Sequence, residues 1–147
     1  MRTVAVVGSG EATSAEIEDA YAVGRLLGTR GCVVVTGGLG GIMAAASRGA
    51  RSAGAVTVGV LPGLDRGAAN EWITVVLPTG LGELRNGLIV RAAEGLIAIG
   101  GEYGTLSEVA LALKGGKRVI GLHFRWSIDG VEEAASPQEA VRSLMGS

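Results

Sequence analysis

The sequence predicts an α/β fold of the Rossmann type, with a doubly wound, mainly parallel sheet of about six strands flanked by helices. Three observations support this prediction. Short runs of apolar residues recur along the chain, helical patterns separate them, and glycine-bearing turns follow several of the runs. The 147 residues suit a single ligand-binding domain spanning residues 1–147, and 26 glycines with only 3% aromatic residues suit small-residue packing with tight turns.

Six runs of apolar residues are expected to form the strands. Most of them are continuous rather than alternating, which is typical of strands covered on both faces of a sheet. They lie at Thr3–Val7, Cys32–Thr36, Val56–Val60, Ile73–Leu77, Gly95–Ile99 and Arg118–Leu122. Because helical patterns alternate with these runs, the strands are expected to be parallel.

Two helices are expected in the first half of the chain. The first opens with Thr13 and Glu16 at the spacing of a capping box and closes at Gly31, a typical C-terminal cap. The second is alanine-rich and covers residues 41–54. The segment 61–72, after the third strand, has no helical or strand pattern and is expected to be an irregular loop.

Three helices are expected in the second half. The pattern over residues 81–94 carries Leu81, Leu84 and Leu88 on one face. The pattern over residues 105–116 has an apolar face and ends at two glycines. A short terminal helix begins at the proline of "SPQEAVRSLM".

Glycine-bearing turns follow three of the expected strands, as "GSGEAT", "TGGLGGIM" and "GGEYGT". The carboxyl ends of parallel strands meet at one edge of the sheet, which is where such folds bind ligands. Glycines allow close backbone approach, and a helix N-terminus beyond the turn suits a phosphate. The candidate phosphate- and ligand-binding residues in these turns are Gly8, Ser9, Thr36, Gly37, Gly38, Gly40, Gly41, Gly100, Gly101, Tyr103, Gly104 and Thr105.

Each turn also has a plainer interpretation, in which the glycines only permit a tight connection. "TGGLGGIM" lacks the Lys-Ser/Thr ending of a Walker loop, and "GSGEAT" lacks the third glycine of a dinucleotide fingerprint. Two long turns at corresponding strand ends nevertheless favour a phosphate-bearing ligand. We therefore expect the turns at Gly37 and Gly101 to hold one anionic group together.

Charged side chains near these turns have two interpretations each. Glu108 stands at the mouth of the sheet, but it also has capping-box spacing with Thr105 and can simply cap its helix. Arg85 borders an apolar stripe and can reach a phosphate bidentately, or it can be a surface arginine paired with Glu83 or Glu94. The neighbouring Asn86 can contact a base or a ribose.

Composition excludes several classes of function. Net charge is −1 with no basic block, so no nucleic-acid partner is expected. Cys32 and His123 are each the only residue of their type, so a cysteine or histidine metal site within one chain is excluded and no metal is expected. We expect His123 to serve packing or to lie at the rim. The N-terminus lacks a long apolar segment, which predicts a cytoplasmic protein without a membrane partner.

Three stretches resemble a known family: "TGGLGGIMAAASRGARSAGAVTVGVLP", "LRNGLIVRAAEGLIAIGGEYGTLSE" and "ALALKGGKRVIGL". Together they resemble the Lonely-Guy (LOG) phosphoribohydrolases, a superfamily whose members often carry the label of lysine decarboxylases. The resemblance is closest to its short molybdenum cofactor carrier branch and covers residues 3–122. Decarboxylation itself is excluded, because the only two lysines, Lys114 and Lys117, lie at a helix end.

The family's most specific motif is an arginine followed, after a helix and a strand, by P-G-G-x-G-T-x-x-E. By resemblance Arg85 and Glu108 are the catalytic pair of the hydrolases, which cleave a base from a ribose 5′-monophosphate. The segments Thr36–Gly41 and Gly101–Thr105 correspond to the phosphate turns. A carboxylate suits this reaction because it can stabilise a developing oxocarbenium charge.

The sequence departs from the hydrolase motif at three positions. Gly100 replaces the proline, Glu102 replaces the second glycine, and Asn86 stands where the hydrolases carry a lysine. Glu102 places negative charge in a turn meant for phosphate. These departures favour the carrier branch, whose members imply ligand binding without turnover.

Three functions are therefore weighed. The first is binding of a nucleotide-like phosphate ligand, either the molybdenum cofactor (molybdopterin) or an AMP-like nucleotide, with no further cofactor required. The alternative is a nucleoside 5′-monophosphate phosphoribohydrolase that uses Glu108 and Arg85, and the third is a scaffold with an emptied site. The resemblance also implies a homodimer or homotetramer, assembled through the helices that flank the site.

Overall fold

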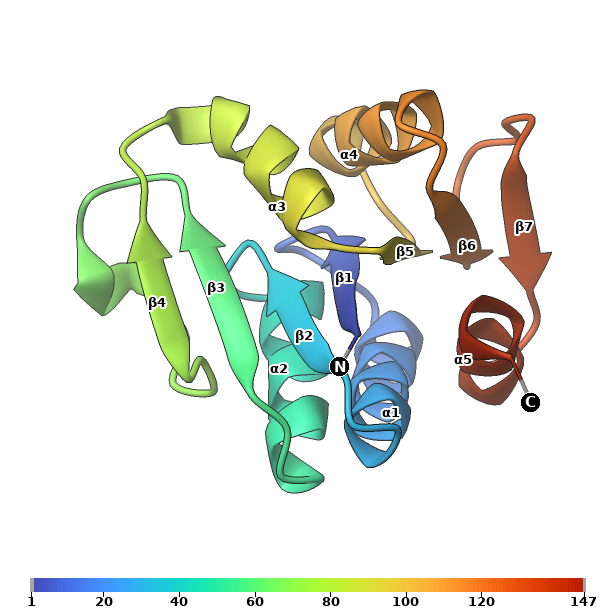
Figure 1. Ribbon diagram of the computed structural model, residues 1–147, viewed down its shortest axis with the longest axis horizontal. Coiled ribbons are helices and arrows are strands. Elements are labelled where there is room, and N and C mark those ends of the chain that lie inside the picture. The colour runs from blue at the N-terminus through green and yellow to red at the C-terminus, as the bar shows by residue number, and fades with distance from the viewer. Residues whose placement is uncertain (1, 147) are drawn as a thin grey trace.

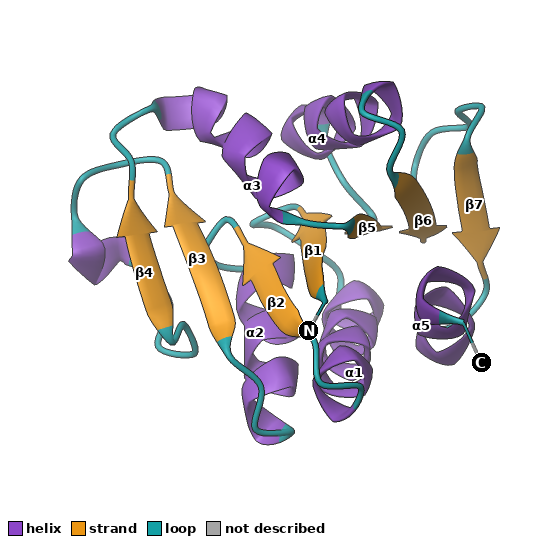
Figure 2. Cartoon of the chain, viewed as in Figure 1, coloured by secondary structure: helices purple, strands orange, loops and turns teal. Residues whose placement is uncertain are grey.

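The computed structural model describes residues 2–146, which form one parallel sheet with helices on both faces (Figures 1 and 2). The strand order is β4-β3-β2-β1-β5-β6-β7. The strands are β1 (Thr3–Gly8), β2 (Val33–Thr36), β3 (Thr57–Leu61), β4 (Val75–Pro78), β5 (Gly95–Ile99), β6 (Arg118–Leu122) and β7 (Val131–Ala134). The predicted Rossmann-like α/β class is confirmed, and the sheet has seven strands rather than about six.

The additional strand, β7, lies at the sheet edge beside β6. Its sequence "VEEA" exposes both glutamates, so it lacks the apolar run that marks the buried strands. Glu132 forms an ion pair with Arg118 of β6 at 2.5 Å. An exposed edge strand of this kind carries no pattern that distinguishes it from a polar loop.

Five helices cover the sheet in two layers (Figure 1). One face carries α1, α2 and α5, and the other carries α3 and α4. Their bounds are α1 (Ser14–Thr29), α2 (Ile42–Ser52), α3 (Asn86–Ala92), α4 (Tyr103–Lys114) and α5 (Pro137–Met145), with single 3₁₀ turns η1 (Arg66–Ala68) and η2 (Gly82–Arg85). The capping box predicted for Thr13 and Glu16 is confirmed at the start of α1.

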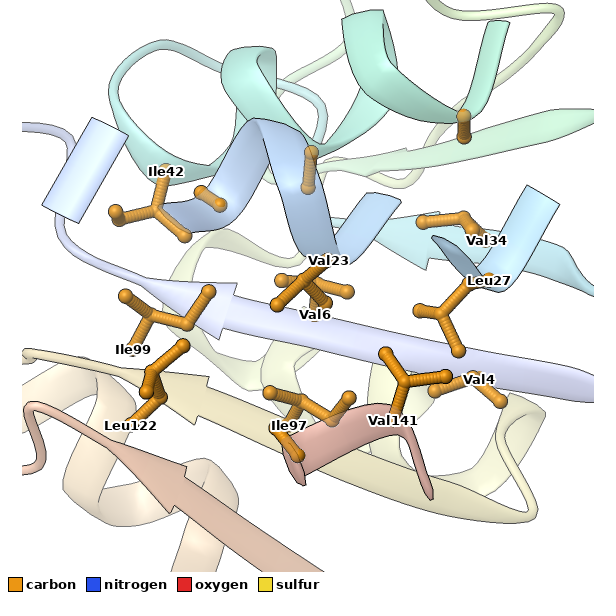
Figure 3. Packing of buried hydrophobic residues seen from close by; sticks show 14 of the residues in the cluster. Val4, Val6, Val23, Leu27, Val34, Ile42, Ile97, Ile99, Leu122 and Val141 are labelled. Carbon is orange, nitrogen blue, oxygen red and sulfur yellow. The ribbon is translucent and has the colours of Figure 1, made fainter. Parts of the chain in front are cut away.

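The core has two halves because each central strand buries both of its faces. In β1, Val4 and Val6 pack toward α1, α2 and α5, whereas Ala5 and Val7 pack toward α3 and α4. Figure 3 shows the first half, where side chains of β1 and β5 meet those of α1 and α5. Full burial of each Val or Leu side chain contributes about 1.5–3 kcal/mol.

The α1–α2 contact depends on two glycines. A Cβ atom on Gly24 would lie 2.0 Å from the Ala46 carbonyl oxygen, and one on Gly49 would lie 2.0 Å from the Tyr21 carbonyl oxygen. The two helices therefore pack backbone against backbone. The small residues of α2 serve this contact within the chain.

The helix predicted over residues 81–94 differs from the structure. Residues of η2 precede a shorter α3, and the predicted apolar stripe is exposed, with Leu84 at 79%. The buried side chains of α3 are instead Asn86, Ile89 and Val90. The segment carries two sets of apolar residues, the predicted leucines and the pair Ile89 and Val90, and the second set packs on the sheet.

Candidate functional site

A pocket of about 300 Å³ lies at the carboxyl edge of the sheet, where the turns after β1 and β2 meet α3 and α4. We call it the central pocket. Of the residues that the sequence analysis proposed, those that line it are Gly8, Gly37, Arg85, Asn86, Gly104, Thr105 and Glu108. Residues that line it without having been proposed are Val7, Gly10, Leu39, Met43 and Glu102.

Backbone contacts hold the first two turns together. Gly41 has a positive φ of 60°, and a Cβ atom there would lie 2.4 Å from the Ser9 carbonyl oxygen. That same oxygen accepts a hydrogen bond from the Ile42 amide at 3.1 Å. Gly41 is also the N-cap of α2 and offers no side chain, so the first amides of α2 are left to other acceptors.

Arg85 is held in the pocket by a strand, not by surface carboxylates. Its Nε donates to the Val60 carbonyl oxygen at 2.8 Å, and its Nη1 donates to the Asn86 side chain. A Cβ atom on Gly37 would lie 2.7 Å from Arg85 Nη2, so the glycine makes room for the guanidinium. Within residues 2–146, neither Glu83 nor Glu94 pairs with it, and the surface interpretation is wrong.

Asn86 connects α3 to α4. It is 7% exposed, accepts from Arg85 through Oδ1 and donates from Nδ2 to Ser107 Oγ at 3.3 Å. This bridge fixes the orientation of the guanidinium relative to α4. Asn86 therefore positions Arg85 in this structure.

The start of α4 differs from the prediction. Thr105 is not the N-cap; the helix begins at Tyr103, and Glu102 forms the capping box with Thr105. The Glu102 amide donates to Thr105 Oγ1 at 3.4 Å. The N-cap is thus three residues earlier than expected, at Glu102 instead of Thr105, and directly follows Gly101, whose φ is 116°.

This earlier start frees Glu108 from the capping role and places it inside the pocket. Its side chain belongs to the buried face of α4 and is 7% exposed. Burial raises the pKa of Glu108 to about 8, and the nearby charge of Arg85 offsets only part of that rise. Burial also lowers the pKa of Arg85, while the charge of Glu108 opposes the change.

The turn after β5 contains a carboxylate, that of Glu102. Ser9 Oγ donates to Glu102 Oε1 at 3.2 Å and accepts from the Glu11 amide at 2.9 Å. The Glu102 carboxylate thus lies at the α4 N-terminus and lines the central pocket. Gly100 and Gly101 do not line the pocket, and a Cβ atom would lie 2.1 Å from Glu16 Oε2 on Gly100 and 2.9 Å from Thr105 Cγ2 on Gly101.

The remaining candidate residues lie around the pocket without lining it. Thr36 Oγ1 accepts from the Gly38 amide at 3.0 Å and stabilises the turn. Tyr103 is 83% exposed, and Gly40 has open space around it. His123 Nε2 lies 2.5 Å from Asp19 Oδ2, and His123 does not line the central pocket.

Two further properties of residues 2–146 concern metal ions and membranes. No group of three or more histidine, cysteine, aspartate or glutamate side chains in this range is arranged to hold a metal ion. None of the helices in the same range is both long and apolar enough to span a bilayer.

The fold and the pocket define a Rossmann-like protein with a glycine-lined, arginine-containing site at the carboxyl edge of its sheet. The chain belongs to the SLOG cluster4 family, whose model matches residues 1–145. A protein from Archaeoglobus fulgidus is 40% identical over 144 residues, which are 98% of this chain and 95% of the relative. The expected membership of the Lonely-Guy superfamily is thereby confirmed.

Solved structures agree with the carrier branch. The molybdenum cofactor binding protein from the phototrophic bacterium Rippkaea orientalis is 36% identical, with a TM-score of 0.90 over 97% of this chain and 94% of that one. The molybdenum cofactor carrier protein from Chlamydomonas reinhardtii is 31% identical, with a TM-score of 0.89 over 97% and 96% of the two chains. The chain is therefore similar to this branch in sequence and in structure.

Proposed function

We propose that the protein binds a phosphorylated pterin of the molybdenum cofactor type in the central pocket and releases it unchanged. The observation that carries the proposal is the placement of the Arg85 guanidinium and the buried Glu108 carboxyl group in one glycine-lined pocket at the carboxyl edge of the sheet. The similarity to two molybdenum cofactor proteins supports the choice of ligand. We propose no chemical step on the bound ligand.

The protonation states of Glu108 and Arg85 make the pocket suitable for an anion. At pH 7 a carboxyl group with a pKa of about 8 is mostly neutral, whereas Arg85 keeps its positive charge. Glu108 can then donate a hydrogen bond to a ligand oxygen instead of repelling it. Nε and Nη1 of Arg85 are engaged by Val60 and Asn86, so Nη2 is the nitrogen that remains to form charge-assisted bonds with a phosphate.

The anion is expected at the turn after β2, not at the turn after β5. The N-terminus of α2 has no side-chain cap, and its preceding turn brings Gly37 against Arg85. The N-terminus of α4 already carries the Glu102 carboxylate. A single phosphate is therefore expected between the Gly37–Gly41 turn, at the N-terminus of α2, and Arg85, although the Ile42 amide itself already donates to the Ser9 carbonyl oxygen.

Protonation of Glu108 also disfavours the phosphoribohydrolase alternative. Glycosidic cleavage needs an ionised carboxylate to stabilise the oxocarbenium-like transition state. Glu108 is mostly protonated at pH 7, and a second carboxylate, Glu102, lies where the hydrolase motif has a glycine. These two features favour retention of the ligand over its turnover.

The test measures binding and turnover together. Neopterin monophosphate, unphosphorylated neopterin, AMP and inorganic phosphate are titrated by calorimetry, and chromatography follows release of free adenine from AMP. We expect the phosphorylated pterin to bind tightest, with no adenine released. Arg85→Ala should weaken binding about 10- to 100-fold, because a charged hydrogen bond is lost. Arg91→Ala, on the exposed side of the same helix, is the matched control.

Adenine release that disappears in Glu108→Gln would overturn the proposal in favour of the hydrolase. Equal affinity for phosphorylated and unphosphorylated pterin would also contradict it, because the anion would then contribute nothing. A single-stranded oligonucleotide serves as a further probe, and its binding in place of the pterin would reject the proposed ligand class.

We further infer that the protein pairs with a second copy through an apolar face beside the pocket. Leu84, Tyr103 and Leu111 line one groove of about 510 Å³ between η2 and α4, and Leu81 and Leu88 are also exposed. Arg85 and Asn86 border the same groove. A partner on this face would bury exposed leucines and close the edge of the central pocket.

A further inference from the structure

A second cavity, of about 590 Å³, lies on the face of the sheet that α1 and α2 cover. It is formed between the N-terminal halves of these two helices. We call it the α1–α2 groove. Its apolar surface comes from Ile17, Ala44 and Ala45. Tyr21 and Trp72 supply aromatic surfaces, Arg48 supplies a cation, and Glu18 supplies a carboxylate.

The groove is a consequence of how α1 and α2 pack. Gly24 and Gly49 bring the two helices into backbone contact below it. Toward its N-terminus α2 contributes the small side chains of Ala44 and Ala45, so the surface between the helices stays open. This end of both helices is also the carboxyl edge of the sheet, where ligands bind in folds of this class.

The Trp72 wall is fixed by hydrogen bonds. The Trp72 amide donates to Asn70 Oδ1 at 3.0 Å, and the Trp72 carbonyl oxygen accepts from Thr57 Oγ1 at 2.6 Å. Asn70 Nδ2 in turn donates to the Leu39 carbonyl oxygen at 2.8 Å. Trp72 is thus tied to the glycine turn that also borders the central pocket, although its segment shows no regular pattern in the sequence.

Arg48 lies within cation–π distance of both aromatic residues. Its guanidinium carbon is 5.5 Å from the centroid of the Tyr21 ring and 5.7 Å from the centroid of the Trp72 ring. No ion pair or side-chain hydrogen bond occupies this guanidinium within residues 2–146. An arginine held by aromatic faces presents a planar cationic surface with free donors.

These groups match one chemical class of ligand. A fused heteroaromatic ring can stack on the arginine and tryptophan surfaces, and its electron-rich carbonyl groups can accept from Arg48. The amino and ring N–H groups of guanine or pterin need an acceptor, which Glu18 provides. Small alanines under the ring leave room for its thickness.

We propose that the α1–α2 groove is a second binding site, which takes an amino-substituted purine or pterin ring through Arg48, Trp72 and Glu18. The site is separate from the central pocket and does not depend on the function proposed for that pocket. Both sites border the Gly37–Gly41 turn, since Gly41 lines the groove and Gly37 lines the pocket.

Tryptophan fluorescence can test this proposal directly. The chain has two tryptophans, so Trp126→Phe leaves Trp72 as the only one. Guanosine, which carries no phosphate, is titrated into this variant with excitation at the red edge of the tryptophan band. We expect saturable quenching, weakened about 10-fold or more by Arg48→Ala because the stacked cation is lost. Arg48→Lys keeps the charge but loses the planar surface, and should also weaken binding.

Two control variants separate binding in this groove from nonspecific quenching and from binding in the central pocket. Arg51→Ala removes an exposed arginine from the next turn of α2 and should leave the quenching unchanged. Arg85→Ala disables the central pocket and should also leave it unchanged, so the two proposals can fail independently. Absence of saturable quenching in the folded variant would overturn the site, as would quenching that is indifferent to Arg48→Ala. Light scattering that shows a dimer broken by Arg48→Glu would assign the groove to a second chain instead.

Discussion

Arg85 and Glu108 share one buried pocket, and the charge of each acts on the pKa of the other. They form no direct ion pair among residues 2–146, and both line the central pocket. Arg85 is anchored from behind by the Val60 carbonyl oxygen, and Glu108 is fixed by its helix. The pair is therefore preorganised, with a cation on one side and a mostly neutral acid on the other.

The first prediction concerns stability and pH. The ordinary pKa of a glutamate carboxyl is 4.5, and that of folded Glu108 is about 8. Between these values the folded chain holds a proton that the unfolded chain has lost, so this residue's contribution to stability falls as pH rises through the window. Glu108→Gln should remove that slope, and above pH 8 the variant should be more stable by on the order of a few kcal/mol.

Urea unfolding at pH 5, 7 and 9 measures this effect. The wild-type free energy of unfolding should decline relative to that of Glu108→Gln across the series. Parallel curves for the two proteins would show that the carboxyl group is ionised in the folded state. That result would also remove the main argument against hydrolysis.

The second prediction concerns Glu102. Its carboxylate lies at the α4 N-terminus and accepts from Ser9 Oγ, where it opposes the entry of an anion. Glu102→Gln removes the charge but keeps an acceptor for Ser9, so affinity for inorganic phosphate should rise several-fold. Thermal shift with increasing phosphate provides the measurement. Glu11→Gln, in the neighbouring turn, is the control for a general change in net charge.

The third prediction concerns the space at Gly37. A Cβ atom there would meet the ends of two flexible side chains, Arg85 Nη2 at 2.7 Å and Met43 Sδ at 2.8 Å. Gly37→Ala should therefore fold, with a loss of stability of about 1 kcal/mol, but displace the guanidinium and weaken ligand binding about 10-fold. Gly40→Ala, where nothing lies within 4 Å, should change neither property. If both variants bind equally well, Arg85 does not contact the ligand.

The buried strands are predictable from the sequence because they leave continuous apolar runs. The strand β7, whose glutamates face solvent, leaves no such run, and the start of α4 lies earlier than its capping residues suggest. In "GGEYGTLSE" two overlapping pairs have the same spacing, Glu102 with Thr105 and Thr105 with Glu108. The structure uses the first pair, directly after Gly101 with its φ of 116°, and the side-chain pattern does not distinguish between the two.

The candidate sites likewise combine residues that a sequence motif identifies with residues that only the fold brings together. Arg85 and Glu108 were identified through a motif, because their spacing along the chain is characteristic of a family. Leu39 and Met43 line the central pocket only because separate elements bring them there. Arg48 and Trp72 form the second groove across 24 residues and match no motif, so tertiary packing alone reveals them.

The fourth prediction concerns the apolar face. Leu84 is 79% exposed, lies beside the central pocket, and contributes nothing to the core of one chain. If a second copy covers this face, Leu84→Glu should convert a dimer or tetramer to a smaller species, because a buried unpaired charge is costly. Light scattering at micromolar concentration measures the change. Val56→Glu, at an exposed apolar residue (42%) just before β3 and therefore at the opposite end of the strands from η2, is the control and should leave the assembly intact. A wild-type monomer, or an assembly that survives Leu84→Glu, would place the interface elsewhere and leave the leucines of η2 and α3 without a role in pairing.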